Sequence, residues 1–125
     1  MDGILNIYKP SGWTSHDVVA KLRKLLKIRR IGHTGTLDPA ATGVLLICIG
    51  KATRVAEYLV EHEKEYRAVL RLGESTDTQD GTGQILERHD VGDITETQLQ
   101  TVMQQFTGDI LQVPPMYSAI KINGV

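Results

Sequence analysis

The sequence predicts an α+β fold for one domain, or for part of one. Helical and strand-like patterns both occur, and they do not strictly alternate along the chain, which argues against a doubly wound sheet. The length of 125 residues suits a single domain, and the composition, 41% apolar and 23% charged, is ordinary for a globular protein. The chain has one cysteine, Cys48, so it offers neither an internal disulfide nor a cysteine-based zinc site.

The first half of the chain contains five predicted segments. Residues 3–9 form a strand that ends at a Pro-Ser-Gly turn. Thr14 then caps a helix to about residue 27, because apolar residues follow at helical spacing. Residues 32–43 form a Gly- and Thr-rich loop, and residues 44–49 a buried strand. Residues 51–60 form a second helix, whose inward-facing residues are Ala52, Val55, Ala56 and Leu59.

The second half mixes the same kinds of element. Residues 64–73 alternate as a strand does, with Tyr66, Ala68, Leu70 and Leu72 on one face. Residues 74–83 read as a loop and residues 84–89 as a strand. Thr95 and Gln98 form a capping box for a helix through residue 106, and residues 116–122 are expected to be extended. The core stripe expected for that helix is Leu99, Val102, Met103 and Phe106.

Nothing in the sequence predicts a membrane or export segment. The longest apolar run, Val44 to Ile49, has six residues, whereas a membrane helix needs about 20. The N-terminus has no charged-then-apolar signal segment. We therefore expect a cytoplasmic protein with no membrane partner.

The charge is balanced over the whole chain and uneven within it. The net charge of −1 combines +5 over residues 1–73 with −6 over residues 74–125. Six basic residues fall within ten positions that hold no acid: Lys21, Arg23, Lys24, Lys27, Arg29 and Arg30. Such a cluster can neutralise phosphates along one side of a protein. The alternative is the solvated face of an amphipathic helix.

The sequence does not match the common motifs for binding phosphate, dinucleotides or metal ions. A phosphate-binding P-loop would need Gly at Leu45 and a hydroxyl at Ala52, and a dinucleotide fingerprint would need Gly at Leu86. The four histidines show no metal-ligand spacing. We therefore expect no cofactor and no metal.

The loop of residues 32–43 carries one carboxylate, Asp38. Pro39 restricts the backbone of Asp38 to extended angles, which fixes the direction of its side chain. The hydroxyl of Thr36 and those of its neighbouring threonines could bind phosphate or backbone groups. Arg29 and Arg30, if nearby, would favour ionised Asp38 and offer phosphate contacts. The alternative is that Asp38 and Pro39 merely form a turn.

The segment from His33 to Leu45, His-Thr-Gly-Thr-Leu-Asp-Pro-Ala-Ala-Thr-Gly-Val-Leu, resembles the catalytic motif of the TruB family of tRNA pseudouridine synthases. Four further segments resemble that family in the same order, and together with the first they cover nearly the whole chain. They are Lys9–Ser15, Lys64–Gly73, Thr76–Gly83 and Pro115–Lys121.

The resemblance implies the pseudouridine synthase fold, a mixed and mostly antiparallel sheet flanked by helices. Residues 1–125 would be the N-terminal part of the catalytic domain, without its remainder and without the C-terminal RNA-binding domain, and would be inactive alone. The implied reaction converts a uridine in the T-arm loop of tRNA (position 55) to pseudouridine after base flipping, without a cofactor. Because the chain starts almost at its first motif, we expect the stand-alone type of enzyme that needs no guide RNA. We also expect a monomer. The competing hypotheses are an RNA-binding module without turnover and a guide-RNA-dependent relative of the same family.

The resemblance also implies roles for single residues. Asp38 matches the essential aspartate, which attacks the base, attacks the ribose or abstracts a ribose proton. Tyr66 matches the tyrosine that stacks on the flipped uracil, and His33 matches the histidine that fills space beside it. Without the resemblance, a core tyrosine and a loop histidine without a partner would be the simpler interpretations. The residues expected to support the loop or contact RNA are Lys9, Arg29, Arg30 and Thr36, and those expected to order a second loop are Asp77 and Asp80.

Overall fold

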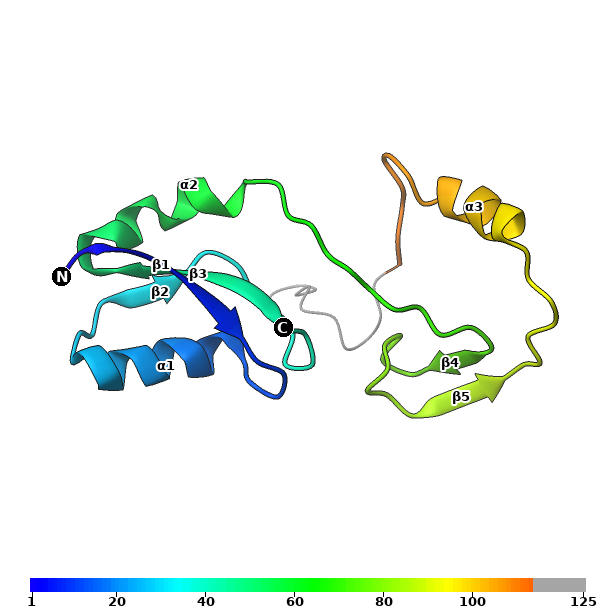
Figure 1. Ribbon diagram of the computed structural model, residues 1–125, viewed down its shortest axis with the longest axis horizontal. Helices are drawn as coiled ribbons and strands as arrows, with labels where there is room; N and C mark the ends of the chain where they lie inside the picture. The colour runs from blue at the N-terminus through cyan, green and yellow to red at the C-terminus, as the bar shows by residue number, and fades with distance from the viewer. Residues whose placement is uncertain (114–125) are drawn as a thin grey trace. The chain divides into compact units, whose positions relative to one another are not determined.

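The computed structural model describes residues 1–113 and divides the chain into two units, Met1–Tyr66 and Arg67–Val125. Helices and antiparallel strands occur in both (Figure 1), so the predicted α+β class is confirmed. The extended segment expected at 116–122 lies outside the described residues. No helix within residues 1–113 has the length and apolar character that crossing a membrane requires.

The first unit is built on a three-stranded antiparallel sheet in the order β1-β3-β2. Strands β1 (Gly3–Lys9) and β3 (Gly43–Ile49) confirm two predicted strands. The third, β2 (Ile31–His33), was expected to belong to the loop, and that prediction is wrong for Gly32 and His33. Backbone pairing of β2 with Ile47 to Ile49 extends the sheet there.

Helix α1 (Ser15–Leu26) supplies most of the remaining core of the first unit. As predicted, Thr14 caps it, because the Thr14 hydroxyl accepts the Asp17 N–H and the Asp17 carboxylate accepts the Thr14 N–H. Lys27, with a φ of 57°, ends the helix in the left-handed conformation. The buried apolar cluster joins α1 to β2 and β3 through Val18, Val19, Ile31, Leu45, Ile47 and Ile49.

The predicted helix at 51–60 is only partly correct. A 3₁₀ helix, η1 (Gly50–Val55), comes first, and only α2 (Ala56–Val60) is α-helical. The Thr53 hydroxyl donates to the Gly50 carbonyl, a bond that favours the tighter turn. Val55 was expected to face inward, but it is exposed. In Figure 1, α1 lies along one face of the sheet and η1 with α2 along the other.

The second unit has a two-stranded sheet and one helix. Strand β5 (Ile85–Arg88) confirms a predicted strand, and it pairs with β4 (Glu74–Thr76), which was expected to be loop. Helix α3 (Glu96–Gln104) has the predicted capping box of Thr95 and Gln98. Its expected core stripe is exposed, however, because no described segment covers it.

The strand expected at residues 64–73 is also absent from the described residues. Positions 63–72 adopt neither helix nor strand, and the side chains of residues 63–72 are exposed. An alternating sequence forms a strand only where a neighbouring strand takes its backbone hydrogen bonds. Among residues 1–113 no strand pairs with this segment.

Candidate active site

Asp38 lies at the tip of the loop that joins β2 to β3. The Ala41 N–H donates to the Asp38 carbonyl at 3.0 Å, which closes a four-residue turn with Pro39 at its second position. Asp38, Pro39 and Ala40 are all exposed. The turn interpretation is therefore correct as geometry, and this turn displays a carboxylate to solvent.

A buried lysine stabilises this turn by a hydrogen bond to its backbone. Lys9, the last residue of β1, is fully buried, and its Nζ atom donates to three backbone carbonyls. The acceptors are Pro10 at 3.0 Å, Trp13 at 2.6 Å and Pro39 at 3.3 Å. An ammonium group has three donors, so all three are used, which offsets the cost of burying the charge. The structure places Lys9 as support for the loop and keeps it away from solvent.

Three further bonds fix the same loop. The Gly12 N–H donates to the Pro39 carbonyl at 2.8 Å, and the Ser11 hydroxyl donates to the Ala40 carbonyl at 3.2 Å. The Leu37 N–H donates to the buried hydroxyl of Ser15 at 2.9 Å. The sequence analysis missed Ser15, although a hydroxyl directly after the Thr14 cap was a usable signal. Together these bonds tie the turn to the segment between β1 and α1.

His33 and its neighbours lie at the start of the loop, away from its tip. His33 pairs with Ile47 at the end of β2 and is half-buried. Its Nδ1 atom is buried and has no hydrogen-bond partner among the described residues. Thr34 is buried, and its N–H donates to the Leu46 carbonyl at 3.1 Å. Thr36 is exposed, so it is open to a ligand.

The condition set for Arg29 and Arg30, that they lie near Asp38, is not met for Arg30. The Arg30 Nε donates to the Thr53 hydroxyl at 2.7 Å, and the Gly50 N–H donates to the Arg30 carbonyl at 2.8 Å. These bonds place Arg30 at the Ile49 end of β3, whereas Asp38 precedes the opposite end. A strand of seven residues spans about 23 Å. Arg29 is exposed and forms no ion pair with Asp38 in the described part of the chain.

Tyr66 is open to solvent in the described part of the chain. Its side chain is 66% exposed, in a segment that was expected to be a strand and is not one. The chain just before it does pass the loop, because a methyl group added to Gly35 would lie 3.9 Å from the Lys64 Cε. Within residues 1–113, no hydrogen bond links Tyr66 to the Asp38 turn.

Asp77 and Asp80 order a turn in the second unit, as expected. One oxygen of Asp80 accepts from the Thr78 hydroxyl and from both the N–H and the hydroxyl of Thr82. These bonds from Thr82 and Thr78 lower the pKa of Asp80 below its ordinary value. Asp77 accepts the Gln84 N–H at 2.8 Å. In residues 1–113, no three histidine, cysteine or acidic side chains gather to form a metal site.

Most of the chain matches a known protein family. The model described as "TruB family pseudouridylate synthase (N terminal domain)" matches residues 23–125. The chain belongs to the TruB family. Proteins named tRNA pseudouridine synthase B are 56% identical in Staphylococcus epidermidis and 52% identical in Clostridium perfringens, over 125 residues each. These matches cover 98% and 100% of this chain but 41% and 42% of the relatives, so the chain spans about two fifths of their length.

Two solved structures share the fold of this chain. A chain from a Cbf5-Nop10-Gar1 complex is 35% identical with a TM-score of 0.63, and the match covers 95% of this chain and 31% of that one. A chain from an H/ACA RNP bound to a substrate RNA containing 2'-deoxyuridine is 32% identical with a TM-score of 0.60, covering 97% and 34%. The likeness to these structures supports the α+β fold.

Proposed function

We propose that this chain is the N-terminal part of the catalytic domain of a longer enzyme. The complete enzyme would also contain the region that its relatives have outside the matched part. We propose that this complete enzyme converts a tRNA uridine to pseudouridine. The proposed target is the uridine of the T-arm loop (position 55). Family membership and the tRNA pseudouridine synthases at 56% and 52% identity support the reaction. The enzyme needs neither a guide RNA nor a cofactor, and it acts as a monomer in the cytoplasm.

The observation that carries the proposal is the fixed, exposed carboxylate of Asp38. The buried Nζ of Lys9 and the N–H of Gly12 both hold the Pro39 carbonyl, so the turn is preformed. A group held in its reactive geometry lowers the entropic cost of reaching the transition state. Each candidate role of Asp38 requires an ionised carboxylate.

The chemistry is an isomerisation, so it balances without a co-reactant. The C–N glycosidic bond of the uridine breaks, the uracil turns, and a C–C bond forms from its carbon 5. The proton on carbon 5 is released to solvent, and the ring nitrogen gains one. Asp38 starts these chemical steps by attacking the base, by attacking the ribose or by taking a ribose proton.

The uridine must leave its stack before Asp38 can reach it. We propose that Tyr66 then stacks on the flipped uracil and that His33 fills the space that the base leaves. Base–aromatic stacking is worth about 1–3 kcal/mol, which offsets part of the unstacking cost. Since Tyr66 is exposed in this chain, we propose that the missing part of the enzyme completes its pocket. The 125-residue chain alone is therefore inactive.

Tritium release from tRNA labelled at carbon 5 of its uridines tests the proposal directly. In the complete enzyme, Asp38→Ala should reduce release below detection, whereas the exposed acid change Asp93→Ala should leave it normal. Tyr66→Leu should lose most turnover and keep RNA affinity within about threefold, because stacking acts on the flipped base. Normal release by Asp38→Ala would rule out the mechanism.

Two controls separate the proposal from its competitors. Release from an isolated T-arm stem-loop, with no other RNA present, is expected for a guide-independent enzyme. RNA binding without any tritium release by the wild-type complete enzyme would instead support a binding module.

A further inference from the structure

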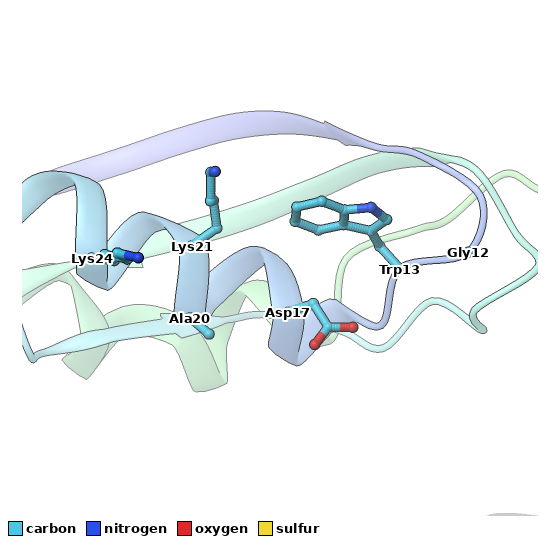
Figure 2. A pocket seen from close by; sticks show the side chains of 6 residues that line it. All are labelled: Gly12, Trp13, Asp17, Ala20, Lys21 and Lys24. Carbon is cyan, nitrogen blue, oxygen red and sulfur yellow. The ribbon is translucent and has the colours of Figure 1, made fainter.

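A shallow groove runs along the exposed side of α1 and begins at the turn before the helix (Figure 2). The helical residues that line it are spaced by three, one and three positions, so they form one stripe of the helix surface. Val18 and Val19, which are buried in the core, belong to the other side. The six lining residues are Gly12, Trp13, Asp17, Ala20, Lys21 and Lys24.

Trp13 forms the aromatic end of the groove. Its side chain is 38% exposed, and the indole extends from the turn toward Lys21 (Figure 2). The large aromatic side chain of Trp13 is thus partly exposed to solvent in a groove that also contains Lys21 and Lys24. Aromatic faces next to basic groups are the surfaces on which single-stranded nucleic acids stack their bases.

The lysines of the groove carry charge that no described carboxylate neutralises. Lys21 and Lys24 are exposed, and neither forms an ion pair within residues 1–113. Asp17 lies four residues before Lys21, a spacing at which the two could pair. The Asp17 carboxylate instead accepts the N–H and hydroxyl of Thr14, at 2.8 and 2.7 Å. The acid is committed to the helix cap, and both lysines remain available to an anion.

The groove also lies next to the candidate active site. Gly12, its first residue, donates its N–H to the Pro39 carbonyl in the Asp38 turn. The next residue is Trp13, whose carbonyl accepts from the same buried Lys9 that holds that turn. A strand that places one nucleotide at Asp38 therefore has the groove within reach of its neighbouring nucleotides.

We propose that this groove binds the tRNA strand beside the target uridine, with one unstacked base on the Trp13 indole and phosphates at Lys21 and Lys24. The inference rests on the proposed function, because it takes the RNA to be the substrate. It adds a binding site apart from the carboxylate and the flipped base. Phosphates supply the charge complement of two free lysines, and the base supplies the complement of the indole.

The test measures tRNA affinity of the complete enzyme at several salt concentrations. Each phosphate contact contributes about 0.7–0.9 to the slope of log affinity against log salt. The double change Lys21→Ala/Lys24→Ala should therefore flatten the slope by about 1.4–1.8. The matched control is Lys51→Ala, an exposed lysine of the same unit outside the groove, which should leave the slope unchanged.

The stacking half of the proposal has its own pair of variants. Trp13→Leu keeps apolar bulk but removes the π-face, and should weaken binding by about 5- to 150-fold, as expected for one lost base stack. Trp13→Phe keeps an aromatic face and should stay within about threefold of wild type. Tryptophan fluorescence that RNA quenches in the wild type should lose that component in Trp13→Phe.

The outcomes also separate this inference from the proposed function. Tritium release by the wild type, together with unaltered slope and affinity in both the lysine and Trp13→Leu variants, would overturn the groove and leave the proposed function standing. A flattened slope and weakened binding without any tritium release would support the groove and reject the isomerase. Equal binding by Trp13→Leu and Trp13→Phe would exclude stacking.

Discussion

Residues 1–66 and residues 67–113 each contain one helix that begins with a capping box, α1 and α3, yet only the first group buries side chains. Thr14 and Thr95 each cap a helix through a reciprocal capping box. Helix α1 then buries Val18 and Val19 against the sheet, whereas no residue at 67–113 is buried. The comparison shows that local signals decide where a helix begins, while burial depends on a partner surface that they cannot supply.

The second unit has the apolar residues for a core but no described surface to cover them. Leu99 and Met103 of α3 are 42% and 55% exposed, although they lie on one helical stripe. A two-stranded sheet such as β4-β5 is marginal by itself in water. Contiguous exposed apolar side chains mark packing surfaces. We expect the complete enzyme to cover this stripe.

The largest expected effect comes from truncating the core of the first unit. Ile47 is fully buried, so Ile47→Ala should lower the free energy of unfolding by about 2–5 kcal/mol. Leu99→Ala, the matched change in the second unit, should cost less than about 1 kcal/mol in the 125-residue chain. Urea unfolding followed by circular dichroism measures both.

The same pair in the complete enzyme would sharpen the comparison. If the stripe of α3 is covered there, Leu99→Ala should become at least about 1 kcal/mol more costly than in the 125-residue chain. A cost for Leu99→Ala equal to that of Ile47→Ala already in the 125-residue chain would break the comparison, because it would mean that both units have a core.

The next effect is on turnover and concerns the buried lysine of the first unit. Lys9→Met keeps the chain length but leaves the carbonyls of Trp13 and Pro39 without their shared donor. A displaced Asp38 turn should reduce tritium release by the complete enzyme about 100-fold, since a misplacement of about 1 Å can cost that much. Lys51→Met, at an exposed site, is the control. Wild-type turnover in Lys9→Met would show that the turn holds its shape without the lysine.

The sequence predicted those elements whose signals are local. Caps and helical spacing predicted α1 and α3, and apolar runs predicted β1 and β3. The three residues of β2 are too few to show a period, and their pairing partner, β3, begins ten residues further along the chain. Conversely, residues 64–73 alternate as a strand does but have no described partner. Both errors, the missed strand β2 and the strand expected at 64–73, arose because strand pairing depends on residues far apart in the sequence.

The candidate site was predicted in part for the same reason. The resemblance to a family pointed to the Asp38 loop and to Lys9 as a loop support or an RNA contact, but not to the three carbonyls that the lysine binds. The sequence left open whether Arg30 lies near Asp38, and the pairing of β2 with β3 places Arg30 at the far end of the sheet. Ser15 was missed because its partner, Leu37, lies 22 residues away. Contacts between distant segments depend on the fold, which a local pattern does not specify.

The smallest expected effect is a pH dependence that separates the two units again. Hydrogen bonds from the side chain and backbone of Thr14 lower the pKa of Asp17 below its ordinary value of 3.8, and bonds from Thr82 and Thr78 do the same for Asp80. A carboxylate whose pKa is lower in the folded state stabilises that state fully above pH 3.8, and this contribution disappears as the pH falls through the folded value. Both groups are exposed, so each contribution is small.

Asp17 and Asp80 should nevertheless report on different processes. As the pH falls below 3.8, Asp17→Asn should reduce the loss of stability in the cooperative unfolding of the first unit, because it removes a carboxylate whose folded-state pKa is lowered. Asp80→Asn should leave that transition unchanged and speed hydrogen exchange at the Thr82 amide, which Asp80 holds. If Asp80→Asn altered the unfolding of the first unit as much as Asp17→Asn does, the two units would unfold together in one transition. The difference in side-chain burial between the units would then not mean that they unfold separately.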